Sequence, residues 1–474
     1  LLPMPERTPL NPAVFGDLTR DGYTVSKVYF ESLPGFYVTG NLYRPSSGAG
    51  PFPAVLSPHG HWAYGRLENS HLVSAPGRAI NLARQGFVVF TYDMIGYNDS
   101  RQLPHTFGGR RESLWGLSLS GLQLWNAIRA LDFMETLPYV RKDGFGVTGE
   151  SGGGTQTFLL AAVDPRVSVA VPVNMISLHM QGGCLCENMP GLRHDINNVE
   201  IAAAIAPRPL LMVSATGDWT KETLEREFPA VRSAYALFDA AAKVHAVRFT
   251  AEHNYNKDSR EAMYAWMARW MQNAPADARR PERGFTVDAL GDLLVFHGRA
   301  LPEGAATADQ LTERWIASAK AQLAAADRAT LQSALRHALG FADTPPSPPA
   351  RPAPAARRVA VVAASTPEVD AALRQAGFEI RPVTFTAFDE PSAAKVRHFD
   401  TYNRTAASQR VADIVAALRQ SPSAVLVADG DAALPALLAA AIVPVRLTAA
   451  NVGRFDTSSA AALLQRIDIA GLRA

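Results

Sequence analysis

A serine among glycines, between a strand pattern and a helix pattern, restricts the possible folds of this chain. Residues 149–153 read Gly-Glu-Ser-Gly-Gly, an apolar β-rich run precedes them, and residues 155–163 have a helical composition. A serine on so tight a turn needs small neighbours, because its backbone is strained and its hydroxyl projects above the sheet. The pattern predicts that Ser151 is a nucleophile and that the N–H of Gly152, at the helix N-terminus, stabilises developing negative charge.

The surrounding sequence predicts an α/β fold with a mostly parallel central sheet flanked by helices. From residue 23 to residue 272, short apolar runs at 52–57, 87–92 and 209–214 alternate with helical patterns. Strands buried on both faces are nearly continuous in apolar residues, as these runs are.

A serine hydroxyl becomes an effective nucleophile only when a base takes its proton and a third group orients that base. His253 ends a strand pattern and precedes a helix pattern, whereas Asp218 follows the buried run at 209–214. We expect His253 to be the general base and Asp218 to orient it. Alternative interpretations make His253 a surface residue and Asp218 a helix cap, with Glu150 and Glu252 as weaker substitutes for the acid.

The loop after the first core strand predicts the second oxyanion donor. Residues 57–62 read Ser-Pro-His-Gly-His-Trp and directly follow an apolar run. We assign the N–H of His61 as this donor, with Gly60 as the alternative. His59 in this loop and Asp93 after the next strand are expected to brace loops by hydrogen bonding.

Pocket residues are expected from the loops at the same edge of the sheet, where aromatic side chains suit sugar faces and equally serve packing. The candidate substrate-binding residues are Trp62, His105, His179 and Trp219. The expected chemistry requires no organic cofactor and no metal ion.

The two cysteines lie close together in the sequence Gly-Gly-Cys-Leu-Cys-Glu. Cys184 and Cys186 are too few for a disulfide framework and supply only half of a typical zinc-ligand set. Free thiols, a local disulfide and a metal site remain open alternatives for this pair.

Composition changes divide the chain into four parts. We expect a catalytic domain at 1–275, a helical connecting segment at 276–343, a Pro/Ala-rich linker at 344–357 and a smaller α/β domain at 358–474. The helical pattern of the connecting segment is strongest at 310–339.

The C-terminal domain contains an echo of the serine turn. Residues 424–442 align without gaps against residues 145–163, and Gly430 then stands opposite Ser151. One interpretation is a degenerate repeat of the hydrolase core without catalytic residues; the other is that any strand, turn and Ala-rich helix would align in this way. We expect no catalysis from this domain in either case.

Charge and hydropathy limit the partners. The 46 basic and 44 acidic residues form no long run of one sign, so nucleic acid is not an expected partner. The sequence lacks an apolar run long enough to span a membrane, which predicts a soluble protein. Homo-oligomerisation remains possible.

The first residues lack a signal-peptide pattern, so a periplasmic or secreted location is expected only if such a peptide has been removed, and a cytoplasmic location otherwise.

Together these motifs resemble the α/β-hydrolase superfamily over residues 23–272, and within it the acetyl xylan esterase and dienelactone hydrolase-like bacterial esterases. The matching motifs are Tyr43-Arg-Pro, His59-Gly60, the turn from Tyr92-Asp93 to Gly96, the Ser151 turn, Ala206-Pro-Arg-Pro-Leu and Glu252-His253. Residues 164–218 are also similar to glucuronoyl esterases. Those enzymes carry arginine directly after the nucleophile, where this chain has Gly152, and this difference argues against uronoyl esters.

The resemblance implies a carboxylic ester hydrolase that works through an acyl-enzyme. Its expected reaction removes a small acyl group, such as acetyl, from a carbohydrate or a similar alcohol, so that the partner is a small-molecule or polysaccharide ester. Alternative functions are a glucuronoyl-type carbohydrate esterase, a serine peptidase of the same fold, and a non-catalytic binding protein.

Overall fold

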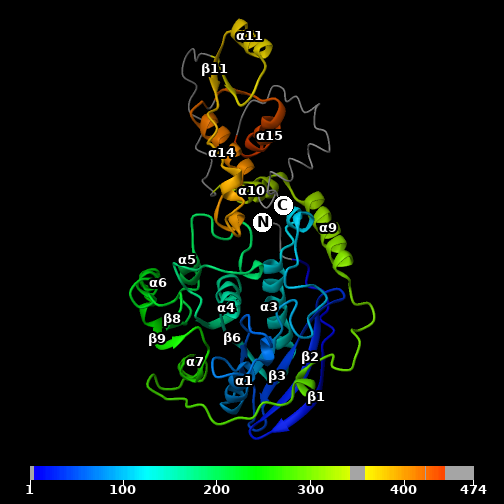
Figure 1. Ribbon diagram of the computed structural model, residues 1–474, viewed down its shortest axis with the longest axis vertical. Coiled ribbons are helices and arrows are strands. Elements are labelled where there is room, and N and C mark those ends of the chain that lie inside the picture. The colour runs from blue at the N-terminus through cyan, green and yellow to red at the C-terminus, as the bar shows by residue number, and fades with distance from the viewer. Residues whose placement is uncertain (1–4, 342–357, 422, 444–474) are drawn as a thin grey trace.

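The computed structural model describes residues 5–341, 358–421 and 423–443, which form a large α/β unit and a smaller one (Figure 1). The linker predicted at 344–357 and the last part of the C-terminal domain lie outside the described residues.

The large unit is built on a nine-stranded sheet with the order β1-β2-β3-β5-β4-β6-β7-β8-β9. The strands β1, β2, β3 and β5 pair antiparallel in succession, and all pairs from β5 through β9 are parallel. The strands are β1 (Ala13–Arg20), β2 (Tyr23–Leu33), β3 (Phe36–Pro45), β4 (Phe52–Leu56), β5 (Val88–Tyr92), β6 (Val140–Glu150), β7 (Val167–Val173), β8 (Leu210–Gly217) and β9 (Val244–Glu252).

Helices cover both faces of this sheet. One apolar core joins the sheet to α3, α4, α5 and α6, and a second core on the other face joins it to α1 and α7. Every residue of β5 is buried, as expected for a strand between two helical layers. The helices are α1 (Ala75–Arg84), α2 (Arg110–Leu114), α3 (Leu119–Thr136), α4 (Gly152–Val163), α5 (Asn198–Ala203), α6 (Glu227–Ala236) and α7 (Lys257–Met271). The predicted α/β fold is confirmed.

Helices occupy only part of the connecting segment predicted at 276–343. They are α8 (Leu290–Leu293), α9 (Ala308–Ala325) and α10 (Arg328–Ala338). Residues 276–289 form no helix or strand and lie along the large unit, where Glu282 forms a buried ion pair with Arg260 of α7. The side chain of Phe285 fills the space beside Gly77 of α1. This stretch, which we call the strap, therefore packs on the large unit.

The small unit has a three-stranded parallel sheet with the order β11-β10-β12. Its elements are β10 (Arg358–Val362), α11 (Pro367–Gln375), β11 (Phe378–Pro382), α12 (Glu390–Ala393), α13 (Phe399–Tyr402), α14 (Ala406–Arg419), β12 (Val425–Val427) and α15 (Ala433–Ile442). The same order and direction occur in β5-β4-β6 of the large sheet. Gly430, after β12, has φ +58°, and Ser151, after β6, has φ 55°. The degenerate repeat stays a prediction, because any strand, turn and Ala-rich helix could share this arrangement.

The two units touch through the loop that follows β7 (Figure 1). The N–H groups of Gly191 and Arg193 donate to the carbonyls of Asp400 and Thr401, at 2.9 Å each. The hydroxyl of Tyr402 also donates to Asn188 Oδ1 over 3.0 Å. The small unit thus contacts the loop that follows β7 at the carboxyl edge of the large sheet.

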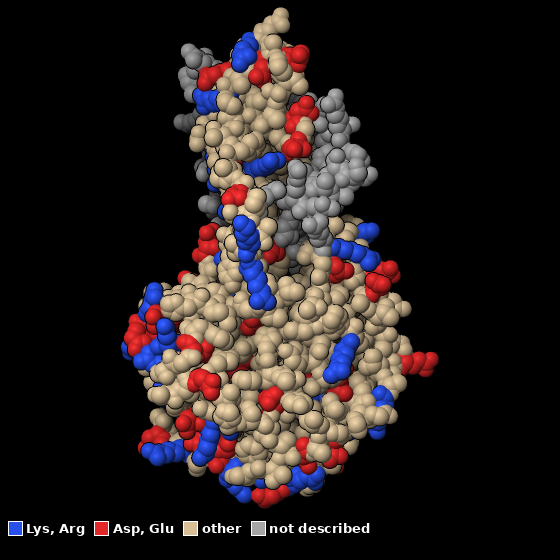
Figure 2. Space-filling model, viewed as in Figure 1, with Lys and Arg blue, Asp and Glu red and all other residues tan. Residues whose placement is uncertain are grey.

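Basic and acidic side chains are interspersed over the face that Figure 2 shows, without a field of one sign. This agrees with the near balance of charges in the sequence. Within the described ranges, no helix combines the length and the apolar character that crossing a membrane requires.

Candidate active site

Ser151 lies on the turn between β6 and α4, in a backbone conformation that few side chains adopt. Its φ and ψ are 55° and −122°, and its N–H donates to the carbonyl of Val173 over 3.1 Å. A Cβ at Gly153 would lie 2.6 Å from the carbonyl oxygen of Pro58, so only glycine fits there. This is the strained strand-to-helix turn that the sequence predicts, and such strain is typical of functional sites.

His253 and Asp218 lie together at the same edge of the sheet, after β9 and β8. His253 Nδ1 is 3.1 Å from Asp218 Oδ2, and the Asp218 carboxylate is fully buried. That carboxylate also accepts from the N–H of Trp219 over 2.6 Å and from the Thr220 hydroxyl over 3.2 Å. Because a carboxylate only accepts, Nδ1 carries the proton in neutral His253, and Nε2 presents a lone pair.

Two contacts hold the loop that carries His253 beside the turn that carries Ser151. Asn174, directly after the strand residue that binds the Ser151 N–H, donates from Nδ2 to the carbonyl of Asn254 over 2.9 Å. The ring of Trp62 stacks on His253 with centroids 5.9 Å apart, and its Nε1 donates to Glu150 over 3.0 Å. The loops that carry the predicted base and nucleophile are therefore neighbours.

The tryptophans predicted to bind substrate flank the His253 ring. The centroid of Trp219 is 4.4 Å from that of His253, and Trp62 lies at 5.9 Å. The third candidate, His179, is exposed and contacts Glu222 Oε2 over 2.9 Å. These three residues belong to the loops around the catalytic edge.

The fourth candidate, His105, has both ring nitrogens engaged within the protein. Nδ1 donates to the carbonyl of Ile95 over 2.6 Å, and Nε2 lies 3.2 Å from Cys184 Sγ. The ring therefore offers no unoccupied nitrogen to a substrate.

Of the two candidates for the second N–H that would donate to the oxyanion, the contacts favour His61 over Gly60. The N–H of Gly60 donates to Glu150 Oε1 over 3.0 Å, so it is already used. Gly152 begins α4, and the first N–H groups of a helix have no acceptor within the helix. The N–H groups of Gly152 and His61 stay our predicted oxyanion donors.

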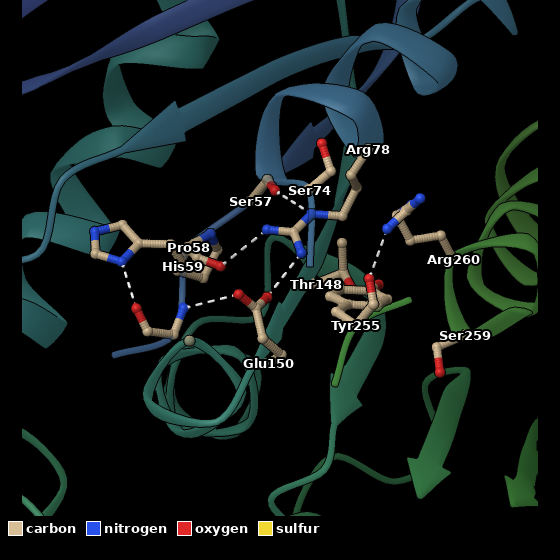
Figure 3. Close-up of polar contacts among 12 residues, drawn as sticks. Ser57, Pro58, His59, Ser74, Arg78, Thr148, Glu150, Tyr255, Ser259 and Arg260 are labelled. Atoms are coloured by element: carbon tan, nitrogen blue, oxygen red, sulfur yellow. Dashed lines mark hydrogen bonds and ion pairs between the residues drawn. The ribbon is translucent and has the colours of Figure 1, made fainter. Parts of the chain in front are cut away.

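Glu150, directly before Ser151, forms a buried ion pair (Figure 3). Arg78 Nη1 is 2.7 Å from Glu150 Oε2, and both side chains are fully buried. Arg78 also donates from Nε to the Ser57 hydroxyl over 2.9 Å and lies 4.5 Å over the Tyr255 ring. The pair connects α1, the loop after β4 and the residue before Ser151. Sequence reasoning missed this role, because Arg78 is distant in the chain and has no motif.

Replacing Arg78 with methionine is expected to destabilise the catalytic domain by about 3–5 kcal/mol, because the Glu150 charge would remain buried without its partner. The free energy of unfolding is measured by denaturant titration, with tryptophan fluorescence as the signal. Arg226→Met is the matched control, since the Arg226–Glu222 pair is exposed and contributes less than about 1 kcal/mol. Equal losses in the two variants would contradict this assignment.

His59 and Asp93 brace the surrounding loops, as the sequence predicts. His59 Nδ1 donates to the carbonyl of Gly60 over 2.7 Å, and Nε2 accepts from the N–H of Met94 over 3.0 Å. Burial lowers the pKa of His59 to about 3, so the ring is neutral. Burial also raises the pKa of Asp93 to about 6, although Arg66 opposes this shift from 3.2 Å.

Cys184 and Cys186 are free thiols in this structure, and two histidines from other loops face them. His61 Nε2 lies 3.0 Å from Cys186 Sγ, while His105 approaches Cys184. The His61 ring also occupies the space beside the nucleophile turn: a Cβ at Gly152 would lie 2.8 Å from its Nδ1. This contact explains the glycine after Ser151. The sequence could not reveal the grouping, because the histidines stand on separate loops.

Similarity to a solved methylesterase supports an esterase. The solved structure named Methylesterase BT1017 is 30% identical, with a TM-score of 0.56, over 67% of this chain and 70% of its own. YtaP of Bacillus subtilis (strain 168), whose name marks it provisionally as a hydrolase, is 26% identical over 262 residues, which cover 51% of this chain and 84% of YtaP. A candidate acetyl xylan esterase structure from Bacteroides fragilis NCTC 9343 is 20% identical, with a TM-score of 0.43, over 52% of this chain and 71% of its own. No protein-family model matches the chain.

The order of the sheet, the strained serine turn and the similarity to the methylesterase agree with one another. The chain therefore belongs to the α/β-hydrolase superfamily, and it is a carboxylic ester hydrolase.

Proposed function

We propose that this chain is a serine esterase that cleaves its substrate through an acyl-enzyme. Ser151 Oγ attacks the ester carbonyl while His253 Nε2 takes the hydroxyl proton, and the alcohol leaves with that proton. Water then attacks the acyl-enzyme, with His253 again accepting and returning a proton. The observation that carries the proposal is the strained Ser151 turn beside a His253–Asp218 pair joined over 3.1 Å.

The surrounding groups have separate roles in this reaction. Asp218 holds the Nδ1–H tautomer of His253, so that Nε2 faces the reacting serine. The N–H groups of Gly152 and His61 donate hydrogen bonds to the carbonyl oxygen on which negative charge develops. Arg78 and Glu150 touch no substrate in this scheme; they position the loop after β4.

The substrate we propose is a small ester of a carbohydrate, with acetyl on a sugar hydroxyl as the first candidate. The rings of Trp62 and Trp219 beside His253 provide flat surfaces suited to a sugar. A methyl ester of a sugar acid is the second candidate, because the 30% identical relative is named a methylesterase. The two candidates place the small group on opposite sides of the scissile bond.

Product analysis separates these candidates. We expect the purified protein to hydrolyse p-nitrophenyl acetate and to release acetate from acetylated xylan at least about tenfold faster than methanol from methyl glucuronate, since a pocket shaped for one ester excludes the other by roughly 1–3 kcal/mol. Acetate and methanol are both quantified enzymatically.

Faster methanol release would exclude the acetyl candidate and retain the serine mechanism. Cleavage of a chromogenic peptide without cleavage of p-nitrophenyl acetate would contradict the esterase proposal itself.

A further inference from the structure

Four side chains that the proposed reaction does not require converge beside the loop at residues 57–62. They are His61, His105, Cys184 and Cys186, and one ligand atom from each lies within 4.8 Å of all the others. His61 Nε2 is 3.0 Å from Cys186 Sγ, and His105 Nε2 is 3.2 Å from Cys184 Sγ. We propose that these four residues bind one zinc ion in a tetrahedral site.

The distances suit zinc. Zinc bonds of about 2.0–2.1 Å to nitrogen and 2.3 Å to sulfur place tetrahedral ligands roughly 3.3–3.8 Å apart, so a set confined within 4.8 Å needs little adjustment. Two thiolates and two neutral imidazoles form a ligand set that selects zinc over calcium or magnesium, which prefer oxygen.

The groups behind the ligands already hold them in place. His105 Nδ1 donates to the Ile95 carbonyl over 2.6 Å, which leaves Nε2 as the lone pair directed at the sulfurs. The Glu187 carboxylate accepts from the N–H groups of Gly183 and Cys184 over 2.8 and 3.0 Å. It also accepts from the Thr155 hydroxyl of α4 over 3.2 Å. Such outer contacts fix ligand orientation before the metal binds.

The topology explains what the ion does. His61 follows β4, His105 follows β5, and the cysteines follow β7, so the ligands come from three loops around the strand that carries Ser151. Four protein ligands close the coordination sphere, which is typical of structural rather than catalytic zinc. The ion ties together the loops that shape the oxyanion side, and it is inferred independently of the esterase mechanism.

Metal analysis tests the site without using activity. Protein purified without chelator is expected to contain about one zinc per chain by mass spectrometry, and Cys184→Ser/Cys186→Ser less than about a tenth of this. His71→Ala is the matched control, because His71 is exposed and outside the cluster, and it should keep its zinc. Zinc retained by the double variant would place the metal elsewhere and overturn the proposal.

Cobalt binding by the wild-type protein provides a second test, which does not depend on the folding of any variant. Wild-type protein treated with chelator and reductant is expected to bind one Co²⁺, with thiolate charge-transfer bands and the visible bands of tetrahedral cobalt. His105→Gln should weaken cobalt binding by more than about 100-fold, since removing even an outer partner costs 10–100-fold. Absence of thiolate bands in the wild type, or a Cys184–Cys186 disulfide that persists under native purification with no bound metal, would overturn the zinc site.

Discussion

Ser151→Ala is expected to lower kcat for p-nitrophenyl acetate by on the order of 10⁴–10⁶-fold, because it removes the only atom that forms the covalent intermediate. Alanine keeps the Cβ, so the turn with φ 55° should persist. Rates are measured at pH 7 to 8, together with circular dichroism and thermal unfolding. What activity remains should come from general stabilisation of the oxyanion and from binding.

Ser233→Ala is the matched control for this substitution. Ser233 lies exposed on α6, and its hydroxyl donates to the carbonyl of Ala230 within the same helix. Its activity should equal that of the wild type. A Ser151→Ala variant that folds normally and keeps more than a tenth of the activity would remove Ser151 from the mechanism.

Loss of the base should have an effect almost as large. His253→Ala is expected to lower kcat by on the order of 10⁴–10⁶-fold and Asp218→Asn by about 10⁴-fold, because each breaks the same proton transfer. The double variant Ser151→Ala/His253→Ala should be no slower than either single variant, since residues that act as a unit are not additive.

Glu252→Gln is the control for the acid, because Glu252 is an exposed carboxylate directly before His253. Its activity should stay within about twofold of the wild type, as expected for a surface substitution. A larger loss from Glu252→Gln than from Asp218→Asn would mean that the acid of the triad has been misassigned.

Local signals in the sequence were enough to place the turn that carries Ser151 and the loops that carry His253 and Asp218. The turn around Ser151 needs glycines because neighbouring backbone leaves no room for a Cβ, and this need is visible in the sequence. His253 and Asp218 each follow a strand, and parallel strands bring their carboxyl ends to one edge. The structure places these two in contact as expected.

Features that depend on distant parts of the chain could not be predicted. The Arg78–Glu150 pair joins residues 72 positions apart, and neither belongs to a pattern that specifies a partner. The strap at 276–289 is fixed by contacts such as Glu282 with Arg260, rather than by its own periodicity. Cys184 and Cys186 supply only half of the ligands for a metal ion, and the two histidines that face them come from other loops.

The α/β pattern of the small domain could be predicted from the sequence, but its contacts with the large unit could not. Its parallel sheet with the order β11-β10-β12 follows the predicted α/β pattern. Its contacts with Asn188 and Arg193 could not be foreseen, because they join surface loops of two units. These contacts lie next to the loop that carries both cysteines.

Covalent labelling with an active-site reagent tests directly whether Ser151 is the nucleophile. Wild-type protein treated with a fluorophosphonate should lose its esterase activity and gain one adduct per chain, which peptide mapping by mass spectrometry should locate on Ser151. The Ser151→Ala variant should gain none. An adduct on another residue, or full loss of activity without modification of Ser151, would contradict the assignment of this serine as the nucleophile.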